Sequence, residues 1–271
     1  MSIQQQFQAA TSDSGFFQEP VELSNVYLSD PILKDLLLRY LPYEQYKFIE
    51  KDLIELGDKV INKVIKLGEL SEYNLPSIKQ YDHWGRRIDE LNVHPAWTEL
   101  QQLGCEEGLV SIPYELPIGD LSRLYQFSKI YLFTPGNMAD CPLSMTDGMS
   151  RVITNLGTKK QKQEILTHLI TRNKCNFYSA GQWMTERKGG SDVSGTETIA
   201  YQKEGQWFID GFKWFSSATD AKVTLLLARV VDENGNGKEG SRGLSLFLAK
   251  VRDDNGKLNG VSRIRIERYE S

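Results

Sequence analysis

Hydroxyl side chains and paired glycines gather in the segment GQWMTERKGGSDVSG, residues Gly181 to Gly195. A predicted strand ends near Thr185 and leads into a loop that contains Gly189, Gly190 and Ser191. Main-chain N–H groups of such a loop can converge on an anion, because glycine places no Cβ in the way. The pattern is compatible with a phosphate-binding loop, although an ordinary bulge and loop is the commoner interpretation of these residues alone.

A second segment, GFKWFSSA from Gly211 to Ala218, ends an alternating aromatic run with two hydroxyls. In a binding site, Trp214 would pack on a flat heteroaromatic ring and Ser216 would donate a hydrogen bond to it. Considered alone, these residues more often belong to a core.

Two further segments match binding motifs in part, but their sequence context does not fit those motifs. Gly235 to Gly240 fits the pattern GxGxxG, but strands are predicted on both sides of it, whereas a dinucleotide fingerprint opens a helix. Asp232, Asn234 and Asn236 begin like a calcium loop, yet the twelfth position is Gly243 and not a glutamate. We therefore expect a hairpin turn here.

The histidines and cysteines predict no metal site. The three cysteines are too far apart for a CxxC pair, and their odd number argues against a disulfide framework, so a reducing compartment fits best. No paired histidine spacing occurs, which favours structural or surface roles for His83, His94 and His168.

Charge and hydropathy exclude other classes of function. The net charge of −4 provides no basic field for nucleic acid. The N-terminus lacks the features of secretory and mitochondrial leaders, and the apolar runs are too short to cross a bilayer. We expect a cytoplasmic protein without a membrane span.

Two kinds of element must position these segments, and their order predicts an α+β fold. Residues 1–172 are predicted to form a helical domain, from amphipathic patterns and stop signals. The individual helices are predicted at 42–70, Ala96 to Leu109, Gly119 to Phe133, Ser144 to Leu156 and Thr158 to Ile170, the last two joined by a left-handed cap at Gly157.

Residues 173–271 are predicted to form an antiparallel β barrel or sandwich. Short aromatic and β-branched runs alternate there with turn signals at 203–205, 234–235 and 255–256. The predicted strands cover 175–184, 196–202, 206–217, 222–231, 243–251 and 262–269.

Taken together, MTERKGGSDVSG and GFKWFSS resemble the flavin-binding signature of the acyl-CoA dehydrogenase superfamily. Members of that superfamily have a β domain after an N-terminal helical domain, in the order predicted here. Within it, VYLSD at 26–30, YDHWGRRIDELNVHPAW at 81–97 and the segment at 181–195 resemble the AidB-like branch.

This resemblance implies a role in FAD binding for residues of both segments. Thr185 and the N–H groups near Met184 match the contacts to the pyrimidine edge of the flavin, and Ser191 matches the contact to the pyrophosphate. Trp214 matches the ring that flanks the isoalloxazine, and Ser216 the hydroxyl that faces N5. The implied cofactor-binding residues are Gln182, Met184, Thr185, Gly190, Ser191, Trp214, Ser216 and Ser217.

The resemblance also implies α,β-dehydrogenation of an acyl-CoA thioester, with an acyl-CoA or fatty acyl ligand as partner. Family members continue into a C-terminal helical domain that supplies the glutamate base and the oligomer interface, whereas this sequence stops at Ser271. No catalytic residue is therefore assigned. We expect weak FAD binding and no turnover from these residues alone, and a homo-oligomer for the complete protein.

Two alternatives remain. One is a regulatory protein of the same fold that binds acyl chains or fatty acids without catalysis. The other is nucleic-acid protection, which the acidic charge balance disfavours. Two structural expectations follow from the flavoprotein interpretation. Thr185, Ser191, Trp214 and Ser216 should line one cleft, and the helices 119–133 and 144–156 should leave apolar surface exposed.

Overall fold

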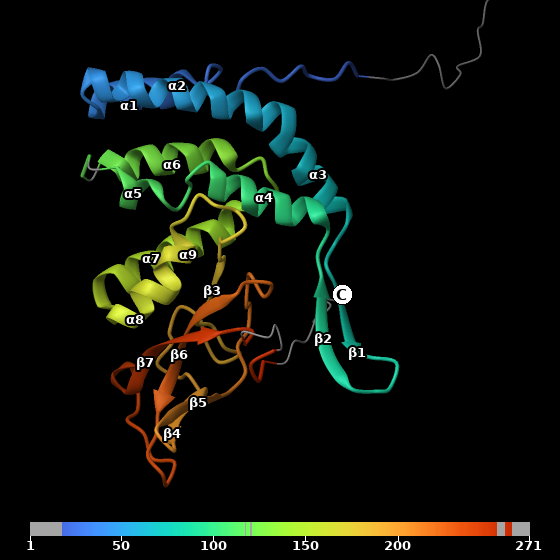
Figure 1. The fold of residues 1–271 in the computed structure, drawn as a ribbon, viewed down its shortest axis with the longest axis vertical. Helices are drawn as coiled ribbons and strands as arrows, with labels where there is room; N and C mark the ends of the chain where they lie inside the picture. The colour runs from blue at the N-terminus through green and yellow to red at the C-terminus, as the bar shows by residue number, and fades with distance from the viewer. Residues whose placement is uncertain (1–17, 117, 120, 254–257, 262–271) are drawn as a thin grey trace, which may run out of the picture.

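The computed structural model describes residues 18–116, 118–119, 121–253 and 258–261, and it places helices at one end and a sheet at the other (Figure 1). The helices are α1 (Pro31–Tyr40), α2 (Tyr43–Lys59), η1 (Val60–Val64), α3 (Ile65–Tyr73), α4 (Pro95–Glu106), α5 (Ile112–Glu115), α6 (Leu121–Phe133), α7 (Asp140–Leu156), α8 (Lys159–Gln161), η2 (Lys162–Leu166), α9 (Thr167–Leu169) and η3 (Ser241–Gly243). The strands are β1 (Ser77–Tyr81), β2 (Arg87–Asn92), β3 (Ala180–Trp183), β4 (Ile199–Lys203), β5 (Gln206–Asp210), β6 (Val223–Val230) and β7 (Leu244–Lys250).

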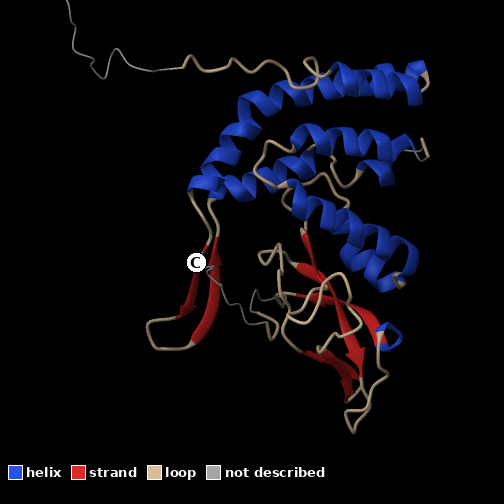
Figure 2. Cartoon of the chain, turned by 180° about the vertical axis from the view of Figure 1, so that it is seen from behind, coloured by secondary structure: helices blue, strands red, loops and turns tan. Residues whose placement is uncertain are grey.

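The predicted helices are all present, but residues 1–172 are not wholly helical. A two-stranded hairpin, β1–β2, leaves the helices between α3 and α4 and projects beside the sheet in both views (Figures 1 and 2). The sequence analysis also missed α1, whose N-terminus is capped by Asp30 through a hydrogen bond from the Leu33 N–H at 2.9 Å.

One continuous rod runs through α2, η1 and α3. Its buried positions Leu56, Val60, Val64 and Gly68 follow one another at steps of four residues. Three such steps would turn the buried stripe by about 120° in a regular α-helix. The π-turn η1, in which the Ile65 N–H donates to the Val60 carbonyl, takes up the extra residue and keeps the stripe facing the core.

Gly157 ends α7 as predicted, but its predicted left-handed conformation is wrong. Gly157 has φ −69° and ψ 146°, which is extended and not left-handed. Glycine is needed there for space, because a Cβ would lie 2.5 Å from the Ile153 carbonyl oxygen. The next helix begins at once with a capping box between Thr158 and Gln161.

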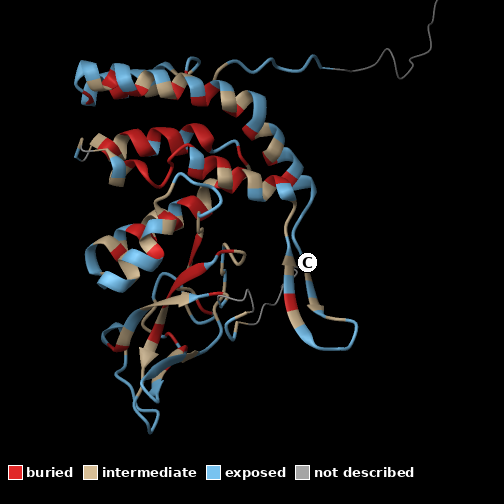
Figure 3. Cartoon of the chain, in the orientation of Figure 1, coloured by how far each residue is buried: buried red, intermediate tan, exposed pale blue. Residues whose placement is uncertain are grey.

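The main hydrophobic core lies among the helices, with α6 buried over much of its surface (Figure 3). It also holds a charged residue, since Lys129 is only 1% exposed. Lys129 Nζ lies 2.6 Å from Asp52 Oδ2 and 3.0 Å from Glu107 Oε2, and Lys59 pairs with the other oxygen of Glu107. A second, smaller core joins α7 and α9 to β3 and β6.

The sheet is mixed and open, so the prediction of an antiparallel barrel or sandwich needs correction. β7 runs antiparallel to β6 along one edge, while β3 and then β4 run parallel to β6 along the other, and β5 completes the order by pairing antiparallel with β4. Turn signals predict antiparallel neighbours only where a tight turn joins them, as Glu204 and Gly205 do at φ 52° and 75°. β3 and β6 are separated in sequence by two other strands, so no turn fixes their relative direction.

The strand predicted at 206–217 ends at Asp210, and residues 211–222 form a connecting segment between β5 and β6. The strand predicted at 262–269 and the turn at 255–256 lie outside the described residues.

Several large apolar side chains are exposed, as expected for α6 and α7. Phe127 and Tyr131 of α6 are 53% and 58% exposed, and Leu156 at the end of α7 is 80% exposed. The other apolar residues of α6 are buried or half-buried. The exposed apolar surface of α6 is therefore smaller than the sequence indicated.

Candidate functional site

The loop after β3 and the segment after β5 meet through their backbones. The Trp214 N–H donates to the Thr185 carbonyl at 2.9 Å. Gly190 lies against the same threonine, since a Cβ at Gly190 would lie 3.1 Å from Thr185 Cγ2 and 3.3 Å from its Oγ1. The structure therefore brings together Thr185, Gly190 and Trp214 from the two segments that the sequence analysis singled out.

A second hydrogen bond fixes the far end of the segment. The Trp183 indole N–H of β3 donates to the Ser217 carbonyl at 3.0 Å. Gly181 leaves room for this contact, because a Cβ there would lie 2.8 Å from Trp183 Nε1 and 3.3 Å from the Ser217 oxygen. Trp183 was not among the predicted site residues.

Next to these two attachments the backbone takes unusual conformations. Phe215 and Ala218 have φ angles of 51° and 54°, the left-handed region that bulky residues rarely occupy. The Phe215 ring stands perpendicular to Trp214 at 5.8 Å between centroids, and the Phe212 ring lies at 6.2 Å. Phe212 and Phe215 are 46% and 65% exposed, so the segment offers a partly open aromatic surface.

A buried ion pair joins the residues next to Thr185 and Trp214 in the sequence. Lys213 Nζ is 2.6 Å from Glu186 Oε1, and the two side chains are only 9% and 5% exposed. Glu186 also accepts the N–H groups of Glu197 and Thr198 at 2.7 and 3.2 Å, and the Thr198 hydroxyl at 2.5 Å.

Burial alone would raise the pKa of Glu186. The hydrogen bonds from Lys213, Thr198 and the Glu197 N–H outweigh that cost and hold the pKa of the Glu186 carboxyl below its usual range.

Two predicted site residues face the helices. The Gln182 amide donates to the Met145 carbonyl of α7 at 3.2 Å, and Met184 packs with the core that joins α7 to β3. Their side chains therefore lie on the helix-covered side of β3.

The predicted hydroxyls differ in exposure. Ser191 and Ser217 are exposed and Ser216 is half-buried. The convergence of the two segments is established by the contacts of Thr185, while a cleft that also includes Ser191 and Ser216 stays a prediction.

A hydrogen bond from the helical region reaches the connecting segment 211–222. The Trp97 indole N–H on α4 donates to Asp220 Oδ2 at 2.9 Å. Asp220 lies just past Ala218, so α4 holds the C-terminal end of the segment.

The calcium-like motif is a turn. Asp232 Oδ1 accepts the N–H groups of Asn234 and Asn236 at 2.9 and 2.8 Å. Those backbone bonds lower the pKa of Asp232 and close the turn. No group of three or more potential metal ligands occurs among the residues that the structure describes.

The histidines near the helices have structural contacts. His94 caps α4 by accepting the Ala96 N–H at 3.2 Å, and the His168 ring stacks on Tyr178 at 4.3 Å. These contacts agree with the structural roles favoured from the sequence.

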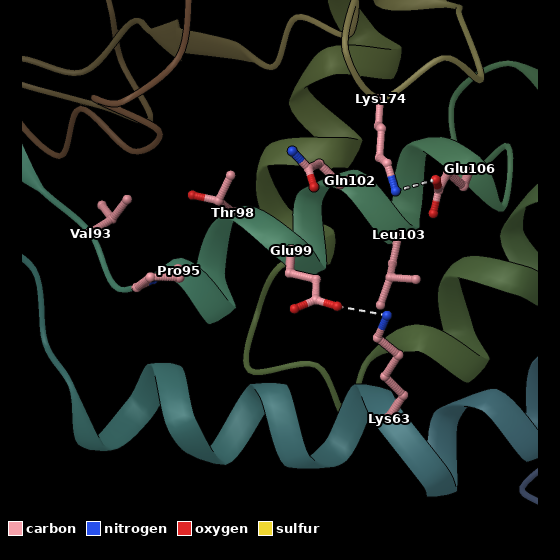
Figure 4. A pocket seen from close by; sticks show the side chains of 9 residues that line it. All are labelled: Lys63, Val93, Pro95, Thr98, Glu99, Gln102, Leu103, Glu106 and Lys174. Carbon is pink, nitrogen blue, oxygen red and sulfur yellow. Dashed lines mark ion pairs between the residues drawn. The ribbon is translucent and has the colours of Figure 1, made fainter.

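A polar cavity of about 450 Å³ lies elsewhere, along one face of α4 (Figure 4). Its charged side chains already pair with one another, Lys63 with Glu99 at 2.6 Å and Lys174 with Glu106 at 2.9 Å. The lining residues include none of the predicted cofactor contacts and are Lys63, Val93, Pro95, Thr98, Glu99, Gln102, Leu103, Glu106 and Lys174.

Over the described part of the chain, no helix has the length and apolar character needed to span a bilayer.

Two family models match the chain in sequence. Residues 18–175 match the adaptive response protein AidB N-terminal domain, and residues 181–269 match the acyl-CoA dehydrogenase middle domain. The first model ends after helix α9, and the second begins within β3, the first strand of the sheet.

Individual relatives agree with these models. Acyl-CoA dehydrogenase family member 11 of Caenorhabditis elegans is 43% identical over 260 residues, which are 93% of this chain and 42% of that protein. The putative acyl-CoA dehydrogenase AidB of Escherichia coli is 28% identical over 94% of this chain and 46% of its own length. The crystal structure of C. elegans ACDH-11 in complex with C11-CoA superposes with a TM-score of 0.90 at 42% identity, over 97% of this chain and 45% of that one. The chain thus spans less than half the length of the curated relatives that it matches.

Proposed function

Since the chain belongs to the acyl-CoA dehydrogenase superfamily, in its AidB-like branch, we propose that it forms one wall of an FAD site in a flavoprotein that acts on acyl-CoA thioesters. The observation that carries this proposal is the junction of the two signature segments, where the Trp214 N–H meets the Thr185 carbonyl at 2.9 Å. A phosphate-binding loop and an aromatic platform at one place fit a dinucleotide that has a flat ring at one end.

The residues of the junction fit such a cofactor. Thr185 offers a hydroxyl. Gly190 lies against it in space, so that a side chain at position 190 would contact the threonine tightly. Ser191 is exposed beside the glycine pair, as a hydroxyl that meets a pyrophosphate must be. The half-buried Trp214, with Phe212 and Phe215 around it, supplies the apolar face for a ring.

Bound FAD would supply the acceptor for the hydride that leaves the acyl chain. The chain's own residues bind and orient. The Thr185 hydroxyl and the N–H groups near Met184 would donate to the polar edge of the ring, Ser216 would donate beside Trp214, and Ser191 would hold the phosphates. Donors fixed in advance around an atom that gains negative charge lower the cost of that charge.

Proton abstraction is not assigned to a residue of this chain. In the family that base is a glutamate of the C-terminal helical domain, so we propose that these 271 residues contribute cofactor and ligand binding to the reaction and do not perform it alone. A fatty acyl-CoA is the proposed ligand, supported by the C11-CoA bound to the C. elegans relative. We also propose that the complete protein is a homo-oligomer, as the family resemblance implies.

FAD titration, followed by flavin fluorescence and visible absorption, tests the proposal. Wild-type chain should bind FAD measurably, and Trp214→Ala should weaken binding by roughly tenfold through loss of ring contact. Trp207→Ala is the matched control, because Trp207 is a 49% exposed tryptophan of β5 that packs against Phe247 on another strand. Equal losses in both variants would contradict the site.

A second titration with a medium-chain acyl-CoA separates the two candidate functions. A chain that binds the thioester but no FAD would favour the acyl-chain-binding regulatory protein over the flavoprotein.

A further inference from the structure

The Glu186–Lys213 ion pair links the two segments of the proposed site. Glu186 follows Thr185 directly, and Lys213 directly precedes Trp214. The pair therefore closes a second connection, 2.6 Å long, next to the backbone hydrogen bond that joins Thr185 and Trp214.

Both members of the pair also bind backbone. Lys213 Nζ lies 3.5 Å from the Met184 carbonyl, and Glu186 accepts the N–H groups of Glu197 and Thr198 that lead into β4. Within the loop, Glu186 and Gly189 exchange two backbone hydrogen bonds, of 3.0 and 3.1 Å. The ion pair thereby fastens the phosphate-side loop, the aromatic segment and the start of β4 to one another.

Stability alone is a poor reason for such a pair. Burying two charges costs about as much free energy as their attraction returns, and apolar residues of similar size often serve as well. Directed hydrogen bonds, in contrast, fix the relative position of two loops that carry few regular backbone contacts.

We propose that Glu186 and Lys213 are positioning residues, which hold Thr185 and Trp214 in the relative position that FAD binding requires. This inference rests on the proposed function. It assigns neither residue a contact with the cofactor.

The experiment compares Lys213→Met, Glu186→Gln and Lys213→Arg with a matched control, Lys129→Met. Lys129 is also a buried lysine paired with carboxylates, but it lies in the helical region. Each variant is measured at a temperature where circular dichroism shows it folded. The two readouts are FAD affinity and hydrogen exchange of the backbone amides of residues 213–217.

We expect Lys213→Met and Glu186→Gln to speed exchange of the Trp214 amide by tenfold or more and to weaken FAD binding by a similar factor. Lys213→Arg should recover most of both. Lys129→Met should lower the unfolding temperature and leave both readouts at the wild-type value.

The outcomes separate this inference from the proposed function. If the wild-type chain binds no FAD, the proposed function fails, and the positioning role toward FAD fails with it whatever the exchange data show. If the wild type binds FAD and folded Lys213→Met and Glu186→Gln keep wild-type affinity and exchange, the inference alone is overturned. Should Lys213→Met not fold, Glu186→Gln and Lys213→Arg still decide, since both retain a hydrogen-bonding group of similar size.

Discussion

The helical region and the sheet region each bury a lysine among carboxylates, but they connect it differently. The Lys129 ammonium pairs with two side-chain carboxylates, those of Asp52 from α2 and Glu107 from the turn after α4. Lys213 and Glu186 instead bind three backbone groups besides each other.

The difference follows from what each region lacks. Helices satisfy their own backbone, so the group around Lys129 has only side-chain charges to compensate within an apolar core. The loops at 184–191 and 211–217 have few regular partners, and there the charged pair takes over backbone positioning. The same kind of buried pair thus balances charges within an apolar core in one region and fixes loop geometry in the other.

Lys129→Met should have the largest effect on stability. It leaves Glu107 buried and Asp52 partly buried without their shared cation, and we expect the free energy of unfolding to fall by about 3 kcal/mol. Urea denaturation measures this. Lys160→Met is the control, because Lys160 is 79% exposed and lies 3.9 Å from Glu164; it should change almost nothing.

Trp97→Phe should remove a hydrogen bond between the helical region and the sheet region. The ring packing is retained, while Asp220 loses the indole N–H at 2.9 Å, which should cost about 1.5 kcal/mol. Hydrogen exchange should rise at 218–222 and not in α6. Trp84→Phe, at an 80% exposed position on the hairpin tip, is the matched control. Equal destabilisation by both changes would argue against the link.

Lowering the pH should destabilise both regions. Burial raises the pKa values of Asp52 and Glu107, but the charge and hydrogen bonds of Lys129, with help from Lys59 at Glu107, bring them below their usual range. The pKa of Glu186 is lowered as well.

A carboxyl whose folded pKa is depressed stabilises the fold above its unfolded pKa, about 4, and loses that contribution as pH falls through the folded value. Unfolding free energy should therefore be flat from pH 7 to about 5 and fall below about 4. Glu186→Gln should reduce the acid slope. An unchanged slope in that variant would show that Glu186 does not contribute to the loss of stability in acid.

Gly190→Ala should give the smallest effect on stability, below about 1 kcal/mol, because only Thr185 must shift to admit the methyl group. Binding of FAD should fall more than stability does. Gly195→Ala is the control in the same loop, since a Cβ there meets no atom within 4 Å. Comparing thermal unfolding with FAD titration for the pair isolates the contact at Thr185.

Much of the helical region was predictable from periodicity. The rod from α2 to α3 and the helices α4, α6 and α7 bury regular apolar stripes, which the sequence displays directly. The hairpin β1–β2 lacks such a signal, because its strands SIKQY and RIDELN are short and polar. Its turn did carry one cue, Asp82, which accepts the N–H groups of Trp84 and Arg86.

The site was predictable only as two separate segments, with the resemblance to a family joining them. Lys213 and Glu186 escaped notice because charged residues in loops usually face solvent, and their pairing spans 27 residues of sequence. A usable signal was present: Lys213 stands between Phe212 and Trp214 in an otherwise aromatic run. The parallel pairing of β3 with β6 is a long-range contact that no local pattern specifies.

The π-turn at Val60–Val64 makes the number of residues in this rod part of the packing code. Deleting one residue within it would remove the turn, restore a regular α-helix and leave the residues that follow facing the core. Deleting a second residue would rotate all that follows by about 100° relative to α2. Gly68, where a Cβ would lie only 2.8 Å from the Pro135 carbonyl oxygen, would then be carried off the surface that it fits. We therefore expect homologous chains to differ in length between Leu56 and Gly68 by at most this one residue, and a chain that lacks it to have a regular α-helix there.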